Sequence, residues 1–419
     1  RSTGKDAGME EEEPRSATAK HMKTEKGKKP KKVTDTRSQR KERMQKYVQF
    51  KPGERFGKRA WEVTRLIDNG GFGVVYEAWN NEKSLVAALK AEPTTTTGES
   101  QLKQEILVLR SVNPHGKTEH FPQIFFATKH RNYAYIIMSL LGDNLRNLRA
   151  CEVKNGKERP KELIKKDHYL LSIGTWSRVG MQLLYAIKSL HDCGFVHRDI
   201  KPANFVIGKG QQMTTIFMLD FGLSRAYAFK GRRDDIWSLF YILIEAHCGL
   251  PWQFEVDRKE LERVKCTIPD AELGKNLPKS LRECFSSLRH LDIYSRPDYT
   301  SIYEALNKAR TLTRTKCDDL YDWEKYNEDY KRPRSYVPNQ FHGWSHNPLA
   351  HFQSLVVPSL IPSDAVSSFL LPFGLQSSLN NCSEQVIPTP PRKTKSWTPP
   401  PEGNTVEAPS KTDCETRTD

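Results

Sequence analysis

The chain has 419 residues, more than one typical domain, so either one large domain with tails or two domains are expected. Its hydrophobic fraction of 37% is low for a chain that folds throughout, which predicts disordered tails around an ordinary core. Eight isolated cysteines argue against a disulfide framework or a zinc site, the sequence has no long apolar run, and no signal peptide is expected. We therefore expect a soluble protein of the cytoplasm, with the nucleus as the alternative, and no membrane partner.

A basic arm precedes the first apolar pattern. Residues 15–46 hold 13 Lys/Arg and 3 Asp/Glu and almost no large apolar side chain, so residues 1–57 are expected to stay unfolded. The run K-K-P-K-K at residues 28–32 suits nuclear import or attraction to acidic or cytoskeletal partners, and a solvated arm without a partner is the alternative. Because no aromatic residues interleave the charges, specific nucleic-acid binding is not expected.

Five strands and one helix are predicted next. Residues 61–67 alternate in polarity and lead into a glycine cluster, and residues 74–79 and 85–90 have the pattern of the next two strands. Leu102, Ile106 and Leu109 recur at helical spacing, with Glu105 beside them. Two apolar runs, 124–127 and 135–138, follow as strands. This order predicts a small β-rich lobe at the start of the folded region.

Helices are predicted in the second half. Apolar residues repeat at helical spacing over 179–190, where Gly194 is a plausible helix end. Residues 235–247 are apolar on every side, which predicts a helix buried in the domain centre. The expected fold class is thus α+β, with a small β-rich lobe, a larger helical lobe and disordered tails. Residues 58–312 are the expected domain.

The composition changes again after residue 312. Three prolines interrupt the apolar stretch 355–375, so neither a membrane span nor a stable helix is expected there. The proline-rich runs at 389–391 and 398–401 suit polyproline-binding modules or proline-directed kinases, while an unstructured tail is the simpler alternative. Residues 313–419 are therefore expected to be a mostly disordered tail.

Four motifs whose residues could take part in catalysis or ligand binding follow one another along the chain. The first, D-N-G-G-F-G-V-V at residues 68–75, lies between two predicted strands, where glycines let a backbone approach phosphate oxygens. The second is Lys90, at the end of an apolar strand, where an ammonium is costly unless a group such as Glu105 pairs with it; a surface lysine is the alternative.

The third motif is H-R-D-I-K-P-A-N at residues 197–204. Asp199 can accept a hydroxyl proton, Lys201 can neutralise charge on a transferred phosphoryl group, and Asn204 can bind Mg²⁺. The fourth is D-F-G at residues 220–222, sixteen residues after Asn204, where Asp220 would be the main Mg²⁺ ligand.

The four motifs together resemble the protein kinase signature, and the chain is most similar to the casein kinase 1 group and its tau-tubulin kinase branch. D-I-K-P-A-N-F at 199–205, G-R-R-D-D-I-W-S-L-F-Y at 231–241, L-P-W at 250–252 and Y-D-W-E at 321–324 carry this resemblance, which covers residues 61–324. It implies a two-lobed kinase that transfers the γ-phosphate of ATP to protein Ser or Thr and uses Mg²⁺ as cofactor. The protein is expected to be a monomer.

The resemblance also implies roles for single residues. It makes Asp199 and Lys201 catalytic, and Asn204 and Asp220 metal ligands; Met138 would be the gatekeeper, and Leu140 part of the hinge that binds adenine. The residues expected to contact the nucleotide are Ile67, Asn69, Gly70, Gly71, Gly73, Val75, Lys90, Glu105, Met138 and Leu140.

The chain departs from the family pattern at two places. Asp68 stands where the first glycine of G-x-G-x-x-G belongs, and a carboxylate near phosphates weakens ATP binding. After Arg225 the segment that should hold the activation loop and the peptide-docking strip is about thirty residues too short. The fifteen residues from Asp220 to Asp235 still extend to about 50 Å, so the core can close. A catalytically impaired pseudokinase or scaffold form is therefore the alternative to an active kinase.

Overall fold

The computed structural model describes residues 39, 42, 44, 46–70, 73–94, 100–150, 164–165, 168–226, 232–252, 255, 257–292, 295–333, 335–337 and 351–352. All of them belong to one compact unit, Arg1–Ser368. The predicted import signal, the interrupted apolar stretch 355–375, the proline-rich runs and Gly71 lie outside the described residues. In the described part, no helix is long and apolar enough to cross a bilayer.

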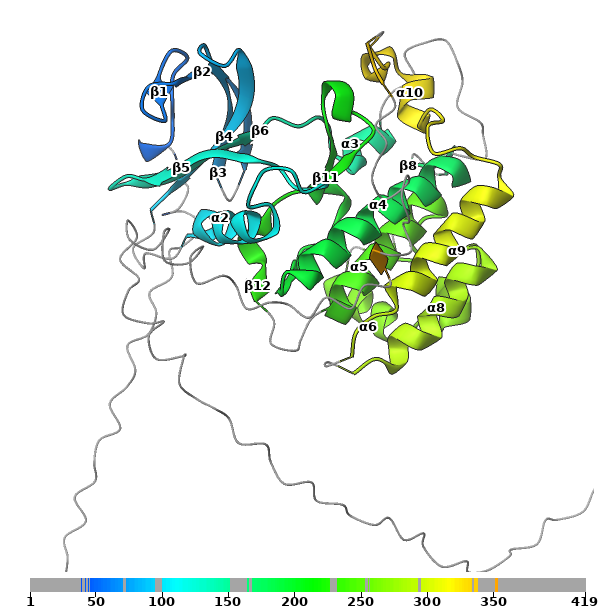
Figure 1. Cartoon of the computed structure of the whole chain (residues 1–419). Helices are drawn as coiled ribbons and strands as arrows, with labels where there is room; N and C mark the ends of the chain where they lie inside the picture. The colour runs from blue at the N-terminus through cyan, green and yellow to red at the C-terminus, as the bar shows by residue number, and fades with distance from the viewer. Residues whose placement is uncertain are drawn as a thin grey trace, which may run out of the picture. The chain divides into compact units, whose positions relative to one another are not determined.

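The first lobe is an antiparallel sheet with one helix against it, drawn in blue and cyan in Figure 1. The strand order is β1-β2-β3-β4-β6-β5. Helix α2 begins after Ser100, whose hydroxyl accepts a hydrogen bond from the backbone N–H of Lys103. The elements are β1 (Arg55–Phe56), β2 (Trp61–Gly70), β3 (Gly73–Asn80), β4 (Leu85–Pro93), α2 (Gln101–Val112), β5 (Ile124–Lys129) and β6 (Tyr133–Ser139). All five predicted strands and the predicted helix are confirmed.

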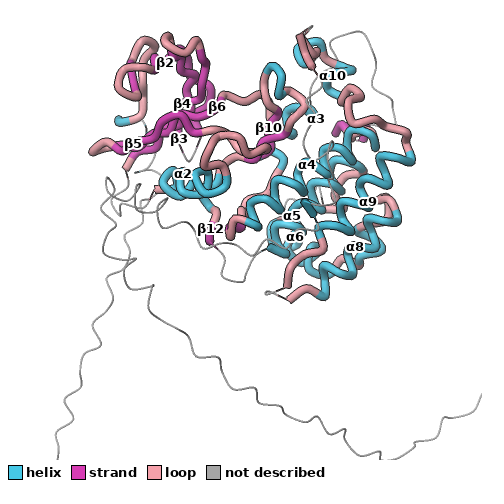
Figure 2. Tube along the Cα trace, in the orientation of Figure 1, coloured by secondary structure: helices cyan, strands magenta, loops and turns pink. Residues whose placement is uncertain are grey.

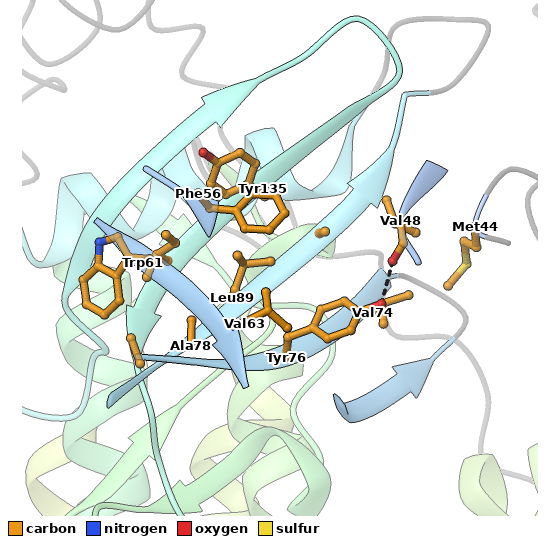
Figure 3. Close-up of a cluster of buried hydrophobic side chains, with 13 residues drawn as sticks. Met44, Val48, Phe56, Trp61, Val63, Val74, Tyr76, Ala78, Leu89 and Tyr135 are labelled. Carbon is orange, nitrogen blue, oxygen red and sulfur yellow. Dashed lines mark hydrogen bonds between the residues drawn. The ribbon is translucent and has the colours of Figure 1, made fainter. Parts of the chain in front are cut away.

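Side-chain alternation gives this sheet two apolar faces with different neighbours. Val74, Tyr76 and Leu89 point into a buried cluster that Met44 and Val48 complete from before the first strand (Figure 3). The Tyr76 hydroxyl donates to the carbonyl of Val48 at 2.7 Å. The folded lobe therefore begins before the boundary expected at residue 58, because two apolar residues of the basic segment cover the open side of the sheet.

The second lobe is mostly helical, as the cyan tube segments in Figure 2 show. Helix α4 (Ile173–Asp192) contains the predicted segment 179–190, and Gly194 follows it at φ 83°. Helix α5 (Arg232–His247) is buried along most of its length, as predicted, although Trp237 remains partly exposed. Further helices are α3 (Leu145–Ala150), α6 (Arg258–Thr267), α7 (Asp270–Leu273), α8 (Lys279–His290) and α9 (Tyr299–Leu312).

Short strands and 3-10 turns connect these helices. Strands β7 (Ile164–Lys165) and β8 (His168–Tyr169) pair with each other before α4. The remaining strands are β9 (Phe195–Val196), β10 (Phe205–Ile207), β11 (Ile216–Met218) and β12 (Arg225–Ala226), and the 3-10 turns are η2 (Pro202–Asn204), η3 (Gly210–Gln212) and η4 (Phe221–Leu223). β10 pairs with β11, and β12 pairs with β9.

The folded unit also extends past the boundary expected at residue 312. Helix α10 (Asp322–Tyr326) and turn η5 (Glu328–Tyr330) follow α9. Arg178 of α4 is 1% exposed and donates to the carbonyls of Cys317, Asp319 and Leu320. Because a buried guanidinium needs such acceptors, this stretch is part of the domain and not of a tail.

Candidate active site

An ion pair joins the sheet to helix α2. Lys90 Nζ of β4 lies 2.6 Å from Glu105 Oε2 and 3.5 Å from Asp220 Oδ1, which follows β11. Burial alone would lower the pKa of Lys90, but the carboxylates of Glu105 and Asp220 outweigh burial and raise that pKa above its ordinary value. The ammonium is therefore kept charged at a place where both lobes meet. This pairing was predicted for Glu105, and the contact with Asp220 comes from the fold.

The second group of polar side chains lies between β9 and β10. Lys201 Nζ is 2.6 Å from Asp199 Oδ2, and Asn204 Nδ2 donates to the same oxygen at 3.0 Å. Asn204 Nδ2 also donates to the backbone carbonyl of Asp199 at 2.8 Å, which fixes the turn. Lys201 and Asn204 are thus both within hydrogen-bond distance of Asp199.

Backbone bonds bring Asn204 and Asp220 to the same place. The N–H of Leu219, the residue before Asp220, donates to the Asn204 carbonyl at 2.9 Å. Nε2 of the buried His197 lies 3.0 Å from the Leu219 carbonyl. On the other edge of β11, the Met218 N–H donates to the carbonyl of His120. The segment that carries Asp220 is therefore held from both sides.

Asp235, at the start of α5, holds the backbone of the turn that leads to Asp199. Its carboxylate accepts the N–H groups of His197 at 2.7 Å and Arg198 at 2.9 Å, and it lies 2.9 Å from His191 Nε2. Burial alone would raise the pKa of Asp235, but these hydrogen bonds lower it below its ordinary value. Sequence reasoning noted Asp235 only as part of a family marker. An acidic residue opening an otherwise apolar buried helix was the available signal for its role.

The face of the sheet opposite the cluster of Figure 3 carries the predicted nucleotide contacts. Val75 pairs directly with Lys90, and Ala88 pairs with Met138, so all four side chains share one face. Met138 is buried and Leu140 half-buried directly after β6, while Ile67 of β2 is 40% exposed. This arrangement offers an apolar strip beside the Lys90 ammonium.

The glycine hairpin between β2 and β3 has two kinds of glycine. A Cβ on Gly73 would lie 2.7 Å from the Ala91 carbonyl oxygen, so the neighbouring strand itself requires a glycine there. A Cβ on Gly70 would meet nothing closer than 3.8 Å, so the space beside Gly70 is open, as a phosphate-binding backbone needs. Asn69 pairs with Val74, and its N–H donates to Asp68 Oδ1.

The donor set suits a hard cation held together with phosphates. Asp220 offers carboxylate oxygens and Asn204 an amide oxygen, whereas the described residues contain no group of three His, Cys, Asp or Glu that would form an all-protein metal site. Mg²⁺ commonly binds through one or two protein oxygens and the phosphates of its nucleotide. Asn204 and Asp220 therefore fit Mg²⁺ with ATP.

The segment between β12 and α5 is short. Arg225 and Ala226 of β12 pair with Val196 and Phe195, and α5 begins at Arg232, so only residues 227–231 lie between these two elements. This is the place where the sequence predicted a missing docking strip.

Comparisons with known proteins agree with this geometry. The model of the protein kinase domain matches residues 61–234. A Caenorhabditis elegans protein that carries the name of a serine/threonine-protein kinase is 30% identical over 315 residues, which cover 67% of this chain and 85% of that protein. A Dictyostelium discoideum protein named as a serine/threonine-protein kinase is 28% identical over 299 residues, 64% of this chain, and the chain spans 57% of its length. A C. elegans protein named an inactive tau-tubulin kinase is 29% identical over 266 residues, 54% of this chain and 88% of that protein.

Proposed function

The chain belongs to the protein kinase family, and on this premise we propose that it transfers the γ-phosphoryl group of ATP to Ser or Thr of protein substrates. The observation that carries the proposal is the Lys90–Glu105 pair at 2.6 Å with Asp220 3.5 Å away. In protein kinases the corresponding lysine binds the nucleotide phosphates only when the helix glutamate is paired with it and the D-F-G aspartate, here Asp220, is in place.

Each side chain of the site has a separate role in the proposed phosphoryl transfer. Bound Mg²⁺ would neutralise charge on the phosphates, and Asp220 with Asn204 would hold it. Asp199 orients the substrate hydroxyl and accepts its proton, while Lys201, 2.6 Å from Asp199, stabilises negative charge on the group in transfer. Val75 and Met138 supply apolar surface for the adenine base.

We also propose that the chain belongs to the casein kinase 1 group, in or near the tau-tubulin kinase branch. The sequence markers at 231–241, 250–252 and 321–324 support this, as does the relative named an inactive tau-tubulin kinase. We further propose that the protein acts as a monomer in the cytoplasm or nucleus, and the K-K-P-K-K run at residues 28–32 supports the nuclear alternative. Its basic arm would attract acidic or cytoskeletal partners.

A second candidate function, a nucleotide-binding scaffold without phosphoryl transfer, rests on one observation. Only residues 227–231 separate β12 from α5, which leaves little chain to hold a peptide against Asp199. Because phosphoryl transfer depends on positioning, loss of that surface lowers the rate even when each catalytic residue is present.

Transfer of labelled γ-phosphate to a panel of proteins separates the two functions. We expect phosphoserine or phosphothreonine with the wild-type chain and a rate lower by about 100-fold or more in Asp199→Asn, because that variant loses the general base. If the wild type binds nucleotide but transfers no more phosphate than Asp199→Asn, the result would favour the scaffold and contradict the kinase proposal.

A further inference from the structure

The chain that follows α10 returns to the junction between the lobes. We name residues 327–337 the strap, of which the structure describes 327–333 and 335–337. In Figure 1 the yellow segment after α10 lies beside the green hairpin of β10 and β11. Two tyrosines of the strap form hydrogen bonds with segments that lead into the candidate active site.

Arg332 fixes the strap to the body of the domain. Its guanidinium lies 2.5 Å from Glu324 Oε1 and donates to the carbonyls of Asp318 and Asp319 at 2.7 and 3.0 Å. The Glu324 side chain is 1% exposed, and it also accepts the backbone N–H of Tyr321. A buried carboxylate with two donors makes a rigid anchor, so the tyrosines on either side of Arg332 start from a fixed position.

Tyr330 contacts the segment that follows the hinge. Its hydroxyl donates to Asp143 Oδ2 at 2.6 Å, and Asp143 lies three residues after Leu140. The backbone there is tied to β10, since the Gly142 N–H donates to the Ile207 carbonyl and the Ile207 N–H donates to the Asp143 carbonyl. The contact therefore connects the strap to both the hinge and β10.

The end of the strap contacts the turn between β10 and β11. The hydroxyls of Tyr336 and Thr214 lie 2.8 Å apart. Gln211 donates to the Ser335 carbonyl at 2.7 Å and accepts the Val337 N–H at 3.0 Å. Asn204 directly precedes this hairpin and Asp220 follows it by two residues, so the strap contacts the one hairpin that carries both proposed metal ligands.

We propose that Tyr330 and Tyr336 are positioning residues for nucleotide binding, the first acting through Asp143 on the hinge and the second through the β10–β11 hairpin on Asn204 and Asp220. The proposal rests on the proposed function, because it assigns the strap to the same nucleotide site. It adds to that site a part of the chain that lies after the predicted domain boundary.

Hydrogen exchange of the nucleotide-free protein tests the coupling without any ligand. In Tyr330→Phe we expect faster exchange of the Gly142 and Ile207 amides by about 3-fold to 10-fold. In Tyr336→Phe we expect the same change for the Gly208 amide, which donates to the carbonyl of Thr215, the neighbour of Thr214. The control is Arg289→Gln, which removes the 2.6 Å ion pair with Asp270 on α7, away from the strap. Equal exchange in the tyrosine variants and the wild type would overturn the proposal.

Affinity for a fluorescent ATP analogue with Mg²⁺ supplies the second measurement. Tyr330→Phe should raise the Kd by about 3-fold to 10-fold, as loss of one hydrogen bond to a carboxylate implies, while Arg289→Gln keeps the wild-type Kd. Asp143→Ala and the double variant Tyr330→Phe/Asp143→Ala should bind the analogue no more weakly than Tyr330→Phe alone. Both changes remove the same contact, so their effects on the Kd should not add.

The two measurements separate the possible failures. A wild-type chain that does not bind the analogue would contradict the proposed function, whereas exchange that changes without any change in Kd would reduce the strap to a structural element. Additive effects of Tyr330→Phe and Asp143→Ala would overturn the assigned route through Asp143.

Discussion

Two residues of the candidate active site have backbone angles that side chains rarely adopt. Arg198 has φ 69° and Asp220 has φ 65°, in the left-handed region. Each such residue costs about 1 kcal/mol or more, so its surroundings must hold it. Asp235 holds Arg198 through the 2.9 Å bond to its N–H, and the Leu219 N–H bond to Asn204 fixes the chain just before Asp220. The strain is thus located directly before Asp199 and at the proposed metal ligand Asp220.

Asp68 allows a test of the glycine hairpin at single-residue resolution. Its carboxylate lies on β2, two residues before Gly70, where negative charge repels phosphates. Asp68→Gly should therefore lower the Kd for Mg²⁺·ATP by about 3-fold to 10-fold, measured by calorimetric titration. Glu62→Gln is the matched control, because it removes one negative charge at the far end of the same strand. A Kd that stays the same in Asp68→Gly would show that the carboxylate lies too far from the phosphates to matter.

At the scale of elements, the loop between α2 and β5 extends the β10–β11 pair. His120 Nδ1 lies 2.5 Å from the Ile216 carbonyl, and the His120 carbonyl accepts the N–H of Met218. The side chain is fully buried, and burial lowers its pKa from 6.5 to about 4. His120 also has φ 68°, an angle that Asn tolerates better than most residues.

This loop should make stability depend on pH. The unfolded imidazole takes up its proton as pH falls below 6.5, whereas the folded one does so only near 4, so stability is full above 6.5 and is lost as pH falls toward 4. Between pH 7 and pH 5 we expect His120 to account for a loss of about 2 kcal/mol in the free energy of unfolding. His120→Asn keeps a donor for Ile216 and should reduce that loss. Urea unfolding at both pH values measures it, and equal pH dependence in the two proteins would contradict the assignment.

Local pattern predicted the elements, but not where the domain ends. The strands and helices follow from side-chain periodicity, so the segments around Lys90, Glu105 and Asp235 were found. Met44 and Val48 stand in a charged segment whose composition indicates disorder, yet they pack on the sheet. Asp143 and Tyr330 are 187 residues apart, and only the tertiary fold brings η5, which ends at Tyr330, to Asp143. The hydrogen bonds of Asp235 with His191 and His197 could not be predicted either, because they also join residues far apart in the sequence.

At the scale of the whole molecule, both lobes keep their structure although the connection into α5 is short. β12 pairs with β9 on one side of this connection, and Asp235 is buried in the first turn of α5 on the other side. In the proposed function, Lys90, Glu105 and Asp220 would bind the nucleotide, whereas the chain between β12 and α5 would help to hold the peptide. Nucleotide binding and phosphoryl transfer are therefore proposals that can be tested separately.

The proposed kinase function requires that Lys90 with Glu105 and Asp220 forms an assembled nucleotide site. Equilibrium binding of Mg²⁺·ATP to the wild type and to Lys90→Met tests it directly, with Lys83→Met as control because that lysine is exposed in the turn between β3 and β4. We predict a Kd of about 1 μM to 1 mM for the wild type and for Lys83→Met, and a Kd at least about 10-fold higher for Lys90→Met. Equal binding by Lys90→Met and the wild type, or no binding by the wild type, would contradict the claim.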